Sequence, residues 1–145
     1  MNELIEFKHD EDRKWWYGLD PKHDVVDVLG AKPELVNKLK GRAQRDAEFI
    51  FRATGKKMVI TSYVRPKQDG DKHTLHHYGL AFDKRVKNLP VNVVQGLEHL
   101  AAAERAIDPT SQFTPHNELR DSGDSNQREN WHHHSEQDDN TYGNH

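Results

Sequence analysis

The chain of 145 residues contains no cysteine. This absence excludes a disulfide framework and any zinc site built from thiolates, so a bound metal would need histidine and carboxylate ligands. Apolar residues are also scarce, at 33% of the chain against 31% charged residues. The length suits one domain, whose core must come from a few well-patterned segments.

Long apolar runs and an excess of one charge are missing as well. No stretch approaches the length of a transmembrane helix, and the first twelve residues lack the apolar region of a signal peptide. The formal net charge of −3 gives no basic field of the kind that marks nucleic-acid binders. We therefore expect neither a nucleic-acid partner nor a membrane, and we expect a monomer.

The regular elements are expected in the middle of the chain. Apolar residues at helical spacing predict helices over 33–53 and 91–107, and β-branched runs predict strands over 57–62 and 80–86. Residues 1–13 are interpreted as a polar lead-in and residues 135–145 as a polar tail. An aromatic cluster at 15–17 beside turn residues predicts a core anchor. From residue 111 onward the composition predicts loop.

Histidine is the residue in excess. Six of the eleven histidines lie in two short clusters, at 73–77 and 132–134. In a strand ending at Asp83, the small residues Ala81 and Gly79 share the face of that carboxylate. A bend at Gly79 would bring His76 onto the same face. An imidazole and a carboxylate converging over small residues suit a catalytic zinc with an open coordination position.

The second cluster offers a third ligand. Glu129 precedes His132 by three positions, and a turn between them would let one bind the metal while the other takes a proton from water. Arg65, at the end of the strand that contains Ser62, could hold a substrate carboxylate or stabilise an oxyanion. In an extended segment His132 and His134 point the same way, so His134 could bind the metal while His132 acts on the water.

These elements together resemble the zinc D-alanyl-D-alanine peptidases of the hedgehog/DD-peptidase fold, a group that includes L-alanyl-D-glutamate endopeptidases. The resemblance covers residues 33–134. It rests on Thr74-Leu75-His76 with Gly79, Ala81 and Asp83, on the strand end Ser62 to Arg65, and on Glu129-Asn130-Trp131-His132. One departure is that His134 stands where relatives carry a glutamate.

The resemblance implies an α+β fold in which a small antiparallel sheet carries the zinc site and two main helices flank it. The whole chain, 1–145, would be one metallopeptidase domain. His76, Asp83 and His132 would bind Zn²⁺, Glu129 would be the general base, and Arg65 with Ser62 would bind substrate.

The implied activity is hydrolysis of an amide in the stem peptides of bacterial peptidoglycan, either as an L-Ala-D-Glu endopeptidase or as a D-Ala-D-Ala carboxypeptidase. A phage-type endolysin, held in the host cytoplasm until released to the wall, or a lysin carried in the virion would fit this reading. Two alternatives stay open. One is a catalytically silent zinc module that serves as a structural or interaction part, and the other is a binding domain without metal.

Overall fold

The computed structural model describes residues 3–66, 68–70, 74–116 and 132–138. In chain order the elements are β1 (Ile5–Phe7), α1 (Asp10–Tyr17), η1 (Pro21–His23), α2 (Pro33–Thr54), β2 (Met58–Ser62), η2 (Leu75–Tyr78), β3 (Ala81–Arg85), α3 (Val91–Ile107), β4 (Ser111–His116) and β5 (His132–Gln137). None of the helices within these ranges combines the length and hydrophobicity that a membrane span needs.

The strands form one mixed sheet in the order β1-β2-β3-β5-β4. The expected α+β class is confirmed, but the expectation of a purely antiparallel sheet is wrong, because β1 pairs with β2 in parallel. Strand β1 lies within the predicted polar lead-in. Its residues Ile5 and Phe7 supply the apolar side chains that so short an edge strand needs, and the surrounding acids and lysines hid them.

Two strands also occupy the last quarter of the chain, where loop was predicted. β4 and β5 pair with each other, and β5 adds to the central strand β3. Histidine, serine and glutamine fill β5 in place of β-branched residues, so tertiary pairing overrides its weak propensity. The predicted polar tail therefore contains the end of β5.

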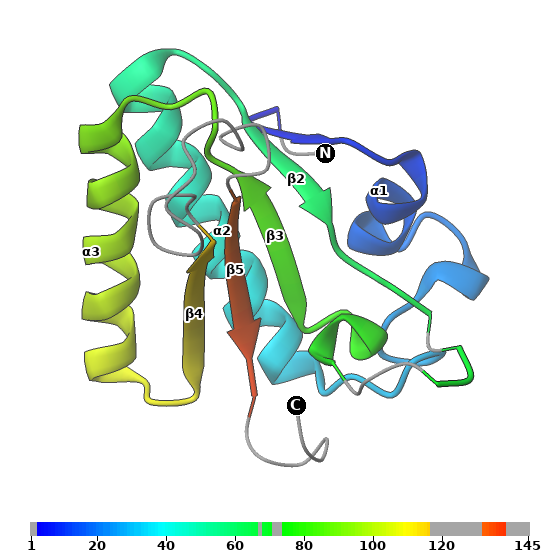
Figure 1. Ribbon diagram of the computed structural model, residues 1–145. Coiled ribbons are helices and arrows are strands. Elements are labelled where there is room, and N and C mark those ends of the chain that lie inside the picture. Colours follow the sequence, from blue (N-terminus) through cyan, green and yellow to red (C-terminus); the bar gives the residue numbers. More distant parts are fainter. Residues whose placement is uncertain (1–2, 67, 71–73, 117–131, 139–145) are drawn as a thin grey trace.

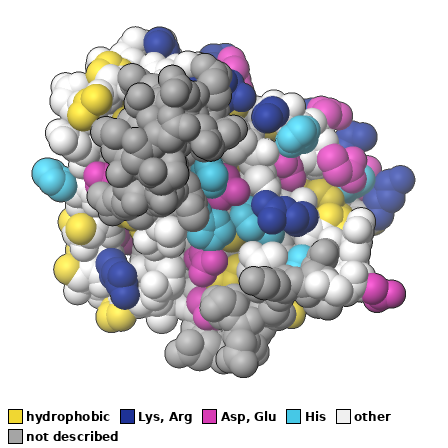
Figure 2. All heavy atoms as spheres, in the orientation of Figure 1, with side chains coloured by type: hydrophobic (Ala, Val, Ile, Leu, Met, Phe, Trp, Pro, Cys, Tyr) yellow, Lys and Arg dark blue, Asp and Glu magenta, His cyan; other side chains and the backbone are white. Residues whose placement is uncertain are grey.

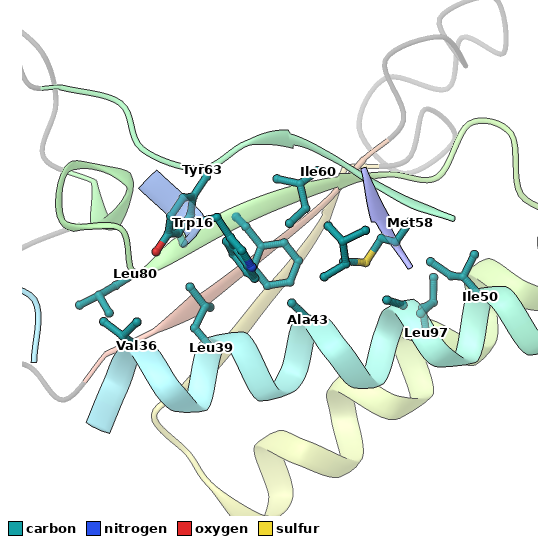
Figure 3. Close-up of a cluster of buried hydrophobic side chains, with 14 of the residues drawn as sticks. Trp16, Val36, Leu39, Ala43, Ile50, Met58, Ile60, Tyr63, Leu80 and Leu97 are labelled. Carbon is teal, nitrogen blue, oxygen red and sulfur yellow. The ribbon is translucent and has the colours of Figure 1, made fainter. Parts of the chain in front are cut away.

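The two main helices lie where the periodicity placed them. α2 runs across the back of the sheet and α3 lies beside β4 (Figure 1). The α2 side chains predicted to face inward are all buried, namely Val36, Leu39, Ala43, Ala47 and Ile50. They meet apolar residues of the sheet such as Met58 and Ile60 (Figure 3).

The predicted aromatic anchor is confirmed at Trp16. Its indole is 4% exposed and packs edge-on against Tyr63, with ring centroids 4.7 Å apart. It also lies 5.9 Å from Phe82 on β3. This aromatic packing fixes α1 against the end of β2, where Tyr63 begins the segment that leads to Arg65.

Charged groups are buried between the sheet and α2. The Lys84 ammonium of β3 lies 3.2 Å from the Asp46 carboxylate of α2, and both side chains are almost fully buried. Arg42 of α2 donates hydrogen bonds to the backbone carbonyls of Glu136 at 2.6 Å and of Gln112 at 3.0 Å. These contacts tie β3, β4 and β5 to one helix. Alternate residues of a strand point to opposite faces, so the other side chains of β3 and β5 point away from α2. We call that side the front face of the sheet.

Gly79 offers a direct test of the turn that precedes β3. Its φ is +70°, and an added Cβ would lie 2.7 Å from Val25 Cγ1. We expect Gly79→Ala to lower the free energy of unfolding by about 2–4 kcal/mol, from left-handed strain and overlap together. Gly41 in α2 is the control, because a Cβ there meets nothing within 4 Å. Gly41→Ala should be neutral or stabilising by about 0.5–1 kcal/mol. Urea unfolding measures both, and equal effects would contradict the prediction.

His23 should make stability depend on pH. Its buried ring lies between two carboxylates. Nδ1 is 2.6 Å from Asp20 Oδ1, and Nε2 is 2.6 Å from Glu11 Oε1. Hydrogen bonding to Asp20 and then to Glu11 raises the pKa of His23. The stabilisation of the folded chain by this ring is therefore complete below about pH 6.5, the pKa of histidine in the unfolded chain. It is lost as the pH rises through the higher pKa of the folded chain.

The variant His23→Gln should accordingly be less stable than the natural chain at about pH 6, with a difference that shrinks toward alkaline pH. Urea unfolding of both chains across this range measures the difference. A gap that widens with rising pH would show that the ring is stabilised in its neutral form.

Candidate metal centre

The centre lies on the front face of the sheet, opposite the two main helices. Histidine side chains gather near the middle of this face, beside acidic and basic ones (Figure 2). His76 comes from η2, Asp83 from β3 and His134 from β5, and one ligand atom from each lies within 4.8 Å of the others. His76 and Asp83 are buried, and His134 is partly exposed. These three residues form a group that could hold a metal ion.

η2 brings His76 to the carboxylate. The Thr74 hydroxyl caps this short helix by accepting a hydrogen bond from the backbone N–H of His76, and left-handed Gly79 ends it. The bend at Gly79 that the sequence predicted is therefore present. It places His76 Nε2 3.5 Å from Asp83 Oδ2.

A backbone carbonyl fixes which nitrogen of His76 can bind a cation. His76 Nδ1 lies 2.6 Å from the carbonyl oxygen of Tyr63, which can only accept, so Nδ1 carries the hydrogen. Nε2 is left facing Asp83. In neutral imidazole this nitrogen bears a lone pair, and metal-binding histidines are commonly oriented by such a bond at the other nitrogen. Ligand atoms around a tetrahedral zinc lie roughly 3.3 Å apart, given zinc–ligand distances of about 2.0–2.1 Å.

The same segment is held by His77. Its Nδ1 lies 2.6 Å from the carbonyl oxygen of Arg65, while the backbone N–H of Arg65 donates to the carbonyl of His76. Asp12 of α1 accepts a hydrogen bond from the backbone N–H of Val64 at 3.0 Å. The strand extension 63–65 is therefore bound on both sides, and His77 has a structural role next to the centre.

β5 supplies the third side chain. Its register pairs Asp83 with His134 and Arg85 with His132. His134 Nδ1 lies 2.7 Å from Asp83 Oδ1, and His134 Nε2 lies 2.7 Å from Glu136 Oε1. Sequence reasoning did not single out Glu136, whose signal was its alternation with His134 along one strand face.

His132, which we predicted as the third ligand, is not a member of this group. It shares the front face with His134 but lies two positions away along β5, a separation of about 7 Å. The structure thus groups His134, the alternative third ligand, with His76 and Asp83. Glu129, the predicted base, lies outside the described residues.

The carboxylates set the charge of the centre. Burial by itself would raise the pKa of Asp83, but the hydrogen bond that His134 Nδ1 donates outweighs it and holds that pKa well below its usual range. Burial by itself would lower the pKa of His134, but Asp83 and Glu136 outweigh it and raise the pKa to about 9. The surroundings of His134 therefore favour positive charge, which suits a bound cation.

Arg65 stands at the edge of this centre. Its Nη2 lies 4.0 Å from Asp83 Oδ2 and donates a hydrogen bond of 3.0 Å to Ser62 Oγ. Over half of the side chain is exposed. The structure therefore brings Ser62 and Arg65 beside the group, with the guanidinium accessible to a molecule that approaches the front face.

Metal binding by single variants distinguishes the two registers. We expect the full chain to bind one Zn²⁺, and His134→Ala to weaken binding by at least about 10–100-fold, a loss typical even of groups that only orient a ligand. His132→Ala should bind nearly as the natural chain does. Titration calorimetry against a competing chelator measures both. The reverse ranking would make His132 the ligand.

No family model, curated protein or solved structure matches this chain. What the centre does must therefore be inferred from its own chemistry.

Proposed function

We propose that the protein is a zinc-dependent peptidase that hydrolyses an amide in the stem peptides of bacterial peptidoglycan. The observation that carries this proposal is the convergence of His76, Asp83 and His134 on the front face of the sheet, with the His76 ring oriented by the Tyr63 carbonyl. The motif resemblance around residues 62–83 supports the choice of substrate.

The donor set fits zinc. Two imidazoles and one carboxylate are the ligand number and type of catalytic zinc sites, which keep a fourth position open. In such a site Zn²⁺ supplies Lewis acidity, which polarises the scissile carbonyl and makes water a stronger acid. His76, Asp83 and His134 would hold the ion, while Glu136 would orient His134 through the 2.7 Å contact with its Nε2.

The remaining residues of the front face have roles that follow from their charge. Arg65, steadied by Ser62, would bind a substrate carboxylate or stabilise the oxyanion that forms when water attacks the amide. A general base must then take a proton from that water and pass it to the leaving amine. Glu129 is the predicted base, and His132, on the same face of β5 as His134, is the alternative.

The direct test incubates the full chain with purified peptidoglycan, with added zinc or with chelator, and follows new amino groups and fragment masses. We expect zinc-dependent release. Fragment masses distinguish loss of a terminal D-alanine from a cut between L-Ala and D-Glu. Zinc binding without release from walls of several chemotypes would contradict the peptidase and favour the catalytically silent module.

Arg65→Ala should lower the rate of release by about a hundred- to a thousandfold, the usual effect of losing an oxyanion donor. Zinc affinity should stay nearly unchanged, because Arg65 is not in the ligand group. Arg105 of α3 is an exposed arginine on another element, so Arg105→Ala is the matched control and should keep full activity. Equal rates for the two variants would exclude Arg65 from catalysis.

A further inference from the structure

A hollow lies between α1, the loop that follows it and the start of α2. It has a volume of about 310 Å³, at the lower end of the range for small-molecule sites. Its lining includes Trp15, Tyr17, Asp24, Val25, Asn37 and Lys40. None of these residues belongs to the metal centre. We call this hollow the α1–α2 pocket.

The aromatic wall of this pocket is held in place. Trp15 packs edge-on against His23, with ring centroids 5.0 Å apart, and His23 is itself fixed by Asp20 and Glu11. Because the imidazole has contacts on both nitrogens, the indole beside it is restrained before any ligand arrives. A restrained aromatic ring loses little conformational entropy when a ligand packs on it.

The charged side chains that line the pocket have no net charge together. Lys40 is half-buried, and its ammonium lies 5.8 Å from the centroid of the Trp16 ring. Burial lowers the pKa of Lys40, and the Asp24 carboxylate opposes that change. One cation, one anion and the Asn37 amide give donors and acceptors without net charge. This balance suits a neutral ligand that has both hydroxyl or amide groups and an apolar face.

The pocket wall also contacts the turn at Gly79, which ends the short helix that contains His76. Val25, in its wall, is buried against Gly79, so closely that an added Cβ would overlap its methyl group. Gly79 ends η2, in which His76 lies. A ligand in the pocket is therefore separated from the His76 segment by one layer of side chains.

We propose that the α1–α2 pocket binds an N-acetylated sugar of the glycan strand to which stem peptides are attached. A pyranose ring has an apolar face that packs on aromatic rings and a rim of hydroxyl and acetamido groups for Asp24, Asn37 and Lys40. In its choice of substrate this inference rests on the proposed function. Its ligand binding needs neither metal nor catalysis.

The test is an NMR titration of the full chain with tri-N-acetylchitotriose, followed through backbone amide shifts. We expect saturable shifts centred on Gly18, Val26 and Asn37, and weaker ones with cellotriose, which lacks acetamido groups. Asn37→Ala should weaken binding about 3–10-fold, the effect of one hydrogen bond. Asn37 is exposed in α2, so this variant should fold. Asn92→Ala in the first turn of α3 makes the same change on an exposed site outside the pocket and should bind normally.

Trp15→Ala should abolish binding, with folding checked by the unshifted core amides. Absence of saturable shifts in the natural chain, or equal affinity in the Asn37 and Asn92 variants, would overturn the proposal. The two failures are separable. Sugar binding without wall hydrolysis would support the sugar site and contradict the peptidase function. Zinc-dependent hydrolysis without sugar binding would support the peptidase function and contradict the sugar site.

Discussion

The pairing of β3 with β5 is the interaction on which the front face depends. It joins residues that are fifty-one positions apart, and it sets Asp83 opposite His134. β5 has little intrinsic preference for a strand, so its position follows from the hydrogen bonds of β3 on one side and β4 on the other. Without that pairing, His76 and Asp83 would form a two-residue cluster, which is one ligand short of a catalytic zinc site.

A second constraint is the use of backbone carbonyls to aim side chains. The segment that continues β2 presents the carbonyls of Tyr63 and Arg65 to His76 and His77, and Asp12 binds its Val64 N–H. The Arg65 guanidinium leaves from this same segment. One short stretch of main chain therefore orients an imidazole and a cation together, and a shift of the stretch would displace both. The helix α1 takes part in the centre in this indirect way.

Local sequence patterns were sufficient to predict the two main helices and part of the metal group. Helical spacing located α2 and α3, and the run from Thr74 to Asp83 located the first two members of the metal group. The third member could not be read from the sequence, because three consecutive histidines offer the same chemistry and only the register with β3 separates them. Strand β1 was missed because three residues carry almost no periodic signal, and β4 and β5 were missed because their pairing is non-local.

The Arg42 contacts have a consequence for the chemistry on the opposite face. Sliding β5 by two residues would put His132 beside Asp83 and leave the histidine–carboxylate pair chemically unchanged. That slide would carry Gln137 away from Thr110 and Arg42, and it would move the Glu136 carbonyl that Arg42 holds. The histidine run is therefore degenerate on its own, and the Arg42 contacts behind the sheet help the strand ladder to hold the register in which His134 faces Asp83. Arg42 thus supports the geometry of the metal group from the opposite face of the sheet.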